Sequence, residues 1–310
     1  MSFRLPNVRI GPPVNHQGLT LFPLFTEGNR PVDYLLSDEA IHMALVTVEE
    51  VSEGGSVPEL LVRNEADARV LFLEGEELRG AKQNRVLNCS VLVPAKSHLR
   101  LPVSCVEKGR WRYSSSSFSS SDTMSSSKLR HVLKSSVMQS LKQDQGHRSD
   151  QTAVWHEVGR LQEKLGVASP THALSDTFVL HTDTIVEYRK KLQYFEGCSG
   201  VAVAVGAKLA SIDLFDKPDT CLKVWSRLLA GSALEAMEKK AEGNLAMEEV
   251  EETLRASAAA AWDEVKPIGE GQEFRAAFKG HVASALVCEG SRQKAFHVPC
   301  LVHFSIISGL

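Results

Sequence analysis

The order of strand-like and helix-like segments is the feature of this chain that most constrains its fold. Short runs in which apolar and polar residues alternate fill residues 1–113 and return after residue 272, and such runs are typical of strands. Most of the segments between these regions carry apolar residues every three or four positions, which is typical of amphipathic helices. Because the two kinds of element are segregated, the sequence predicts an α+β protein and not a regular strand–helix alternation.

The sequence predicts three parts of a single domain. Residues 1–113 form an antiparallel β-rich part with five or more short strands and one short helix, SDEAIHMAL, capped by Ser37. Residues 114–150 begin with ten serines in fourteen positions and continue as an amphipathic helix. A serine run buries too little apolar area to order itself alone, so we expect an insertion or a lid there. Residues 151–310 add a helical segment, a hairpin at 201–215, two more helices and a three-stranded meander.

Composition and charge argue against several classes of protein. The net charge of −3 provides no broad basic field for nucleic acid, and no apolar run approaches the length of a membrane span. The N-terminal residues lack the apolar stretch of a signal peptide, so we expect a cytoplasmic location. The scattered cysteines are expected to be buried thiols without a disulfide framework. They are Cys89, Cys105, Cys198, Cys221, Cys288 and Cys300.

The stretch LFLEGEELRGAKQNRVLN, residues 71–88, places many charges and amides between two strand-like runs. A charged hairpin loop at the surface is one interpretation, because loops are normally charged. A ligand site is the other. Carboxylates such as Glu76 serve as general bases, and arginines such as Arg85 bind phosphate through two parallel hydrogen bonds. The amides of Gln83 and Asn84 both donate and accept, which suits a ribose or a base edge.

A second candidate stretch is SCVEKGRWRY, residues 104–113. On a strand, Cys105 and Glu107 share a face, and Arg110 and Trp111 follow a glycine. Cys105 is either a reactive thiolate beside an arginine or a buried, inert thiol, and the second is the commoner situation. Trp111 either stacks on a ligand base or belongs to the core.

Asp213 lies within or near the end of a predicted strand, where a carboxylate can bind a metal or a ribose hydroxyl. Asp216 and Asp219 follow at intervals of three, and DKPD is ordinary turn and helix-cap chemistry. The histidines have no metal-ligand spacing, and the chain contains no P-loop, GxGxxG or HExxH motif.

The segments LEGEELRGAKQNRVLNCSVLVPAKS, LPVSCVEKGRW and IDLFDKPDTCLKVWSRLL together resemble a family grouped by gene neighbourhood. It is the type-one ADP-ribosylglycohydrolase- and rhodanese-phosphatase-associated protein domain family, and the resemblance covers about residues 15 to 305. It implies a link to the metabolism of NAD-derived ADP-ribose and carries no catalytic assignment. The matching positions are Glu74, Gly75, Glu76, Gly80, Lys82, Gln83, Asn84, Arg85, Asn88, Cys105, Glu107, Arg110, Trp111, Asp213 and Asp216.

Three hypotheses for the function remain open. In the first, a site around residues 74–88 and 104–111 binds, and in its catalytic form processes, a nucleotide-derived small molecule such as ADP-ribose. Phosphates would be held by Arg85 and Arg110, and proton transfer would use Glu76, Glu107 or Cys105. Lys82, Gln83, Asn84, Asn88, Trp111 and Asp213 complete the expected ligand contacts.

In the second hypothesis the polar stretch is a buried structural network of a non-catalytic binding or scaffold protein, with Arg85 paired to Glu76 or Glu107. In the third, a metal-dependent hydrolase uses Glu76, Glu107 and Asp213 as oxygen ligands. The first two require residues 74–88 and 104–111 to meet in space. The sequence indicates no particular cofactor, metal or oligomeric state.

Overall fold

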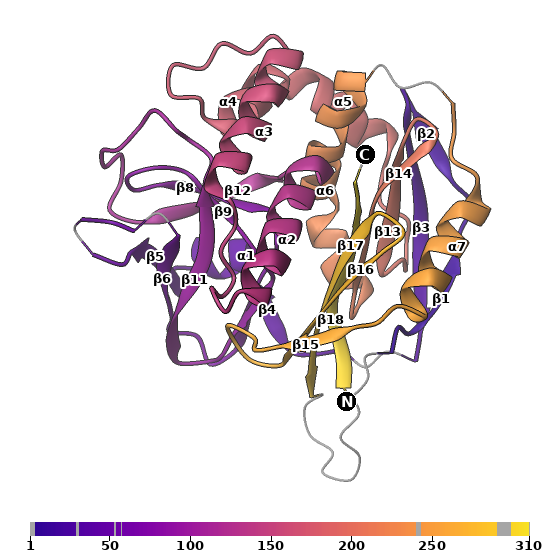
Figure 1. The fold of residues 1–310 in the computed structure, drawn as a ribbon, viewed down its shortest axis with the longest axis horizontal. Helices are drawn as coiled ribbons and strands as arrows, with labels where there is room; N and C mark the ends of the chain where they lie inside the picture. The colour runs from indigo at the N-terminus through magenta and orange to yellow at the C-terminus, as the bar shows by residue number, and fades with distance from the viewer. Residues whose placement is uncertain are drawn as a thin grey trace.

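The computed structural model describes residues 4–28, 31–52, 54–56, 58–239, 243–289 and 299–309. Its elements form an α+β fold of antiparallel sheets and seven helices within these residues, as the sequence predicts (Figure 1). The hairpin, the two helices after it and the meander occur in the expected order. The helices are α1 Ser37–His42, α2 Ser127–Lys142, α3 Gln151–Lys164, α4 Leu174–Leu180, α5 Thr182–Lys191, α6 Pro218–Lys239 and α7 Met247–Ala258.

A nine-stranded antiparallel sheet combines strands from both ends of the chain, in the order β1-β3-β13-β14-β18-β17-β16-β15, with β2 paired to β3. In Figure 1 the early strands of this sheet lie beside the late ones on the right. The strands are β1 Asn7–Ile10, β2 Val14–His16, β3 Leu19–Glu27, β13 Gly200–Val205, β14 Lys208–Phe215, β15 Asp263–Val265, β16 Gln272–Phe278, β17 His281–Glu289 and β18 Pro299–Ser308.

Two smaller sheets contain the rest of the N-terminal strands. A six-stranded antiparallel sheet has the order β12-β8-β9-β11-β6-β5, and a three-stranded sheet has the order β10-β7-β4 with β4 parallel to β7. The strands are β4 Tyr34–Leu36, β5 Val46–Glu50, β6 Glu59–Asn64, β7 Arg69–Phe72, β8 Glu76–Gly80, β9 Arg85–Leu87, β10 Val91–Val93, β11 Ser97–Cys105 and β12 Phe118–Met124.

The nine-stranded sheet separates two hydrophobic cores. On β13, Val201 and Val203 face one core and Ala202 and Ala204 face the other, because successive side chains of a strand point to opposite faces. The first core also contains α2, α3 and α6 and extends to β7 and β9. Helix α7 covers the opposite face. A third core fills the space among the two smaller sheets and α1.

The serine-rich run contributes a strand and a helix start, where the sequence predicts an insertion or a lid. Residues of β12 pair with β8, with Phe118 opposite Gly80 and Met124 opposite Glu76. The ladder uses main-chain groups, so serines do not prevent pairing. The Ser126 hydroxyl then caps α2 by accepting a hydrogen bond from the Leu129 amide. The division of the domain at residues 114–150 stays a prediction.

Candidate functional site

The turn between β8 and β9 is buried, so it is not a solvated hairpin tip. Gly80 begins the turn with φ +126°, and a β-carbon there would lie 2.5 Å from the Ser115 Oγ and 2.8 Å from the Ser117 carbonyl oxygen. A side chain at this position would collide with the segment that covers the turn. The structure therefore brings residues 80–85 and 107–117 together, as two of the hypotheses require.

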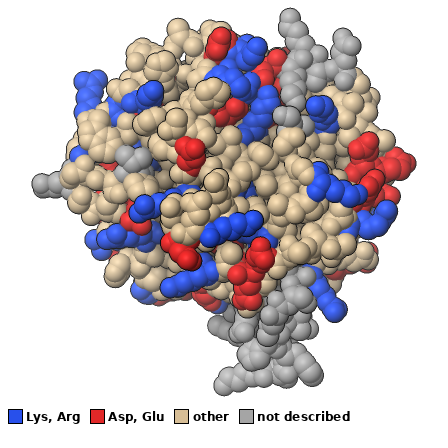
Figure 2. All heavy atoms as spheres, in the orientation of Figure 1, with Lys and Arg blue, Asp and Glu red and all other residues tan. Residues whose placement is uncertain are grey.

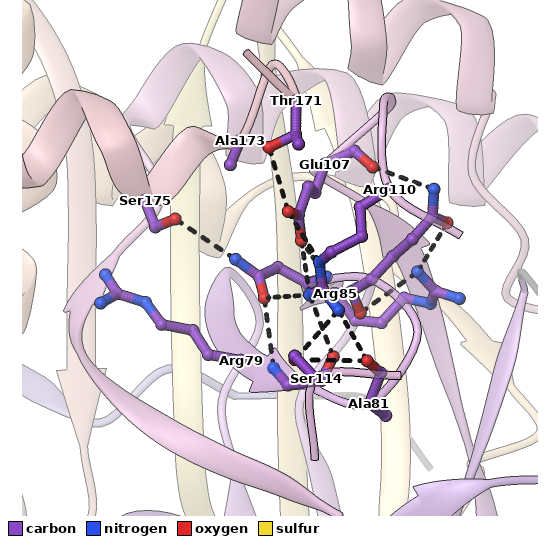
Figure 3. A network of polar contacts seen from close by, with 12 residues as sticks. Arg79, Ala81, Arg85, Glu107, Arg110, Ser114, Thr171, Ala173 and Ser175 are labelled. Atoms are coloured by element: carbon purple, nitrogen blue, oxygen red, sulfur yellow. Dashed lines mark hydrogen bonds and ion pairs between the residues drawn. The ribbon is translucent and has the colours of Figure 1, made fainter. Parts of the chain in front are cut away.

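Glu107 and Arg110 form the centre of the polar network in this region (Figure 3). Arg110 donates from Nε and Nη2 to the two carboxylate oxygens of Glu107, over 2.8 and 2.6 Å. Glu107 also accepts from the Asn84 amide at 3.0 Å and from the Thr171 hydroxyl at 3.1 Å. Burial opposes ionisation of Glu107, but these donors outweigh it and hold the pKa of the carboxyl below its usual range.

Most of the other hydrogen bonds of Arg110 and Asn84 are made to atoms of the turn. Arg110 donates to the carbonyl oxygens of Ala81 at 2.6 Å and Gly80 at 3.3 Å, and to Asn84 Oδ1 at 3.2 Å. Asn84 Oδ1 also accepts from the Gly80 amide, and Asn84 Nδ2 donates to the Ser175 hydroxyl. These bonds hold the turn in shape, as the structural-network hypothesis expects for this part of the stretch.

Arg85 differs from Arg110 because much of its hydrogen-bonding capacity is unused. Its side chain is fully buried, and Nη1 donates to Gln83 Oε1 at 3.1 Å. Among the residues that the structure describes, Nε and Nη2 have no hydrogen-bond partner. Nη2 lies 3.7 Å from Glu50 Oε1, and neither Glu50 oxygen has a hydrogen-bond partner within the described chain. Burial lowers the pKa of Arg85, which marks the cost of keeping this charge out of water.

Two aromatic side chains lie close to Lys82, and one of them also lies close to Arg85. Trp111 is 49% exposed and Tyr113 is 51% exposed. The Lys82 ammonium lies 5.2 Å from each ring centroid, and the Arg85 guanidinium lies 5.8 Å from the Trp111 ring. Gly55 approaches so closely that a β-carbon there would lie 3.2 Å from Lys82 and 3.4 Å from Trp111. We call this group the Arg85 site: Glu50, Lys82, Arg85, Trp111 and Tyr113.

Gln83 and Cys105 lie next to the Arg85 site and are hydrogen-bonded to each other. Gln83 Nε2 donates to the Glu107 carbonyl oxygen at 2.9 Å, and Gln83 Oε1 accepts from Arg85 and from the Cys105 thiol. Cys105 is buried and its pKa is raised, chiefly by burial. All six cysteines are buried thiols, which confirms the expectation. The inert interpretation of Cys105 fits this environment better than the thiolate one.

Glu76 lies in a different network from Glu107. Its carboxylate accepts from the Ser37 hydroxyl at 2.7 Å and from Arg227 Nη1 on α6 at 2.9 Å. Burial raises the pKa of Glu76. The expectation that Ser37 caps α1 is wrong, because Leu36 occupies the cap position and the Ser37 hydroxyl bonds to Glu76 instead.

Asp213 lies in a third network, beneath α2. Arg130 donates to both of its oxygens, over 2.9 and 2.6 Å, and His303 Nε2 lies 3.3 Å from Oδ1. Burial opposes ionisation of Asp213, but Arg130 outweighs it and keeps the pKa low. Nearby, Lys134 donates to Glu74 at 2.7 Å. Glu76, Glu107 and Asp213 are thus each neutralised by a different arginine, and no contact among them supports a shared metal.

Asn88 and Asp216 also lie outside the Arg85 site. Asn88 Nδ2 donates to the His147 carbonyl oxygen at 3.0 Å, and Asn88 Oδ1 accepts from the Ser104 hydroxyl at 2.6 Å. Asp216 accepts from the Val32 amide at 2.8 Å and from the Tyr34 hydroxyl. The partners of both residues thus belong to other parts of the chain than the Arg85 site.

Sequence reasoning missed Glu50 and Tyr113. A signal for Glu50 is present: Val46, Val48 and Glu50 alternate on β5 and all three are buried. A carboxylate on the apolar face of a strand needs a partner or a function. Tyr113 borders the serine run, where no pattern distinguishes it from a loop residue.

The fold and the site define an α+β protein with a buried polar turn between strands β8 and β9. A family model described as ARG and Rhodanese-Phosphatase-superfamily-associated Protein domain matches residues 7–305, so the chain belongs to this family. The family name records an association with ADP-ribosylglycohydrolases. In the same comparisons no curated protein and no solved structure matched the chain.

The surface carries charges of both signs. On the face shown in Figure 2, acidic and basic side chains are interspersed, as the small net charge leads one to expect. Within the part of the chain that the structure describes, no helix has the length and apolar character needed to cross a bilayer.

Proposed function

We propose that the Arg85 site binds a nucleotide-derived small molecule of the ADP-ribose class. Lys82 and Arg85 supply positive charge for a diphosphate. The exposed faces of Trp111 and Tyr113 suit stacking of a base, and the Glu50 carboxylate suits the hydroxyls of a ribose. The family's association with ADP-ribosylglycohydrolases supports this ligand class.

The observation that carries the proposal is the Arg85–Glu50 pair. Both side chains are buried, both keep polar atoms without a hydrogen-bond partner among the described residues, and the nearest atoms are 3.7 Å apart. Buried polar groups in proteins are nearly always hydrogen-bonded, so such atoms are characteristic of positions that meet a ligand or water. A purely structural pair would be expected to close to hydrogen-bonding distance, as Glu107 and Arg110 do.

The proposal assigns different roles to residues that the sequence could not separate. Arg110, Glu107 and Asn84 shape the turn. Gln83 orients Arg85 by accepting from Nη1. If the bound molecule is also hydrolysed, Glu50 is the carboxylate of this site whose oxygens remain available for general-base catalysis.

The first test is thermal unfolding with ADP-ribose. A ligand at about 100 times its dissociation constant stabilises the fold by about 2.7 kcal/mol, so the wild-type transition is expected to rise. Trp111→Ala removes an exposed ring that is expected to contribute about 1.4 kcal/mol to ligand stacking, and it should weaken binding about tenfold. Leu222→Ala, which also truncates an exposed apolar side chain, is the matched control and should bind like the wild type.

Two comparisons identify the part of the ligand that is recognised. AMP tests the stacked base and ribose 5-phosphate tests the phosphate and ribose contacts. If the ligand raised the unfolding temperature of the wild type and of Trp111→Ala equally, the aromatic side chains would not be part of the binding site. The absence of a shift with all three compounds would refute the proposed ligand class. Chromatography of the incubated ligand, for the wild type and Glu50→Gln, then reports whether the protein turns it over.

A further inference from the structure

Three potential metal ligands from distant parts of the chain come together at a position that contains no residue of the Arg85 site. Cys89 lies between β9 and β10, His147 lies between α2 and α3, and Glu273 lies on β16. One ligand atom of each residue lies within 4.8 Å of the others, and all three residues are buried. Among the described residues, this is the group whose side chains have the composition and spacing to hold a metal ion.

We propose that Cys89, His147 and Glu273 bind a divalent transition-metal ion, with Zn²⁺ as the ion that their chemistry favours. Sulfur, imidazole and carboxylate donors are the ligand set of zinc, whereas calcium and magnesium take oxygen ligands. Ligand atoms around a tetrahedral zinc lie about 3.5 Å apart, so small side-chain rotations suffice. Three protein ligands leave one position for water.

The contact between two of these residues supports the assignment. His147 Nε2 and Glu273 Oε2 lie 2.7 Å apart, so they share one proton. Binding of the ion displaces that proton, leaves the imidazole neutral and also releases the proton of the Cys89 thiol. The thiolate and the carboxylate supply two negative charges to the ion, and the Arg275 guanidinium remains as a further cation beside Glu273.

A neighbouring arginine carries hydrogen-bond donors for which the described residues provide no acceptor. Arg275 is buried, and its Nε donates to Glu273 Oε1 at 2.6 Å. Its Nη1 and Nη2 have no hydrogen-bond partner among the residues that the structure describes. Arg275 lies close enough to Cys89 for each to act electrostatically on the other. A metal-bound thiolate would give this buried cation an acceptor.

The loop that carries His147 is held in place. Asn88, next to Cys89 in the chain, donates to the His147 carbonyl oxygen at 3.0 Å and accepts from Ser104 at 2.6 Å. The Ser104 hydroxyl also contacts the Ser149 hydroxyl. Such contacts beyond the ligands fix a metal site and are needed for its affinity. Asn88 is therefore a positioning residue for this site.

The test is metal binding by the full chain, measured without reference to activity. Wild-type protein is stripped with a chelator, incubated with Zn²⁺, passed through gel filtration and analysed for zinc by mass spectrometry under non-denaturing conditions. We expect one retained ion per chain. Cys89→Ser and Glu273→Gln should lower the affinity at least tenfold. Cys221→Ser, which alters another buried thiol, is the matched control and should retain the ion.

Substitution with Co²⁺ keeps the proposal testable if Cys89→Ser fails to fold. Thiolate coordination gives cobalt an intense sulfur-to-metal charge-transfer absorption. This absorption can be measured in the wild type even if the variants do not fold. Its appearance, and its survival in Cys221→Ser, supports Cys89 as a ligand. Wild-type protein that retains no zinc, or retains cobalt without this absorption, overturns the proposal, and the three residues are then a buried proton-sharing cluster.

Discussion

Arg85 and Arg110 show how two arginines of one turn can have opposite roles. The Arg110 guanidinium makes hydrogen bonds through Nε, Nη1 and Nη2, to a carboxylate and to main-chain oxygens. Arg85 makes hydrogen bonds through Nη1 alone among the described residues. The difference arises because Arg110 has Glu107 three residues before it. Glu50 lies on another strand, and its Oε1 is 3.7 Å from Arg85 Nη2, too far for a hydrogen bond.

Glu77 provides a prediction at the residue scale. Burial, opposed by Arg79, raises the pKa of Glu77 to about 7. Between the ordinary carboxyl range and pH 7 the folded state therefore binds more protons than the unfolded state, so the free energy of unfolding falls as pH rises through this window. The loss is on the order of 3 kcal/mol for a shift of this size. Glu77→Gln cannot titrate and should show a flatter profile.

Urea unfolding of the wild type and Glu77→Gln at pH 5 and pH 8 measures this effect. Glu65→Gln, at an exposed position, is the matched control and should follow the wild-type profile. If Glu77→Gln lost as much stability as the wild type between the two pH values, Glu77 would not be the group responsible.

At the scale of the elements, the close contact between α6 and the end of β12 depends on a glycine. A β-carbon at Gly231 would lie 2.5 Å from the Met124 carbonyl oxygen and 2.7 Å from that of Ser125. Gly231→Ala should therefore destabilise the fold by about 1 to 3 kcal/mol, because the helix must move away. Thermal or denaturant unfolding measures the change.

Gly159 in α3 is the matched control, because no atom lies within 4 Å of a β-carbon built there. Gly159→Ala should stabilise the protein by about 0.5 to 1 kcal/mol through helix propensity. Destabilisation of similar size in both variants would show that helix packing against β12 is not the cause.

The elements that sequence reasoning found are those with a periodic apolar face. Helix α2 buries Leu129, Leu133 and Val137 as predicted, and the 201–215 hairpin forms as β13 and β14. Helix α4 and strands β1, β2, β4, β8, β12 and β15 were missed. Most of these strands have three or four residues, too few to display a period, and β12 contains serines that pair through the main chain.

The candidate site could be predicted only in part for a related reason. The stretches around Arg85 and Trp111 are polar and can be recognised in the sequence, and the structure does bring them together. Glu50 is separated from both by intervening strands, and Glu76 points away from Glu107 because it bonds to α6. Which carboxylate meets which arginine is a property of tertiary packing that a single sequence does not contain.

At the scale of the whole molecule, Lys134 links α2 to both groups of strands. It donates to Glu74 at 2.7 Å, beside β8, and to Ser305 on β18 at 2.9 Å. Lys134→Met removes the cation that hydrogen-bonds to buried Glu74 and leaves it, among the described residues, only the ion pair with Arg130 Nε at 3.8 Å, so it should cost about 3 kcal/mol. Lys134→Met with Glu74→Leu should lose less than the sum of the single variants, because no charge is then left unpaired.

A double-mutant cycle in urea measures this coupling. The exposed pair of Arg100 and Glu59, replaced by the same residues, is the control and should couple by about 1 kcal/mol or less. Additive losses for Lys134 and Glu74 would mean that the buried pair does not hold α2 against the strands.

The position of β18 has a consequence for synthesis of the protein. This strand lies between β14 and β17, although it follows both in the chain. While translation proceeds, β14 has no neighbour on that side, because the residues that pair with it are made almost a hundred codons later. The growing chain therefore carries an open, apolar strand edge during the interval between the synthesis of β14 and that of β18. Protection of nascent chains by chaperones is expected to matter most during that interval.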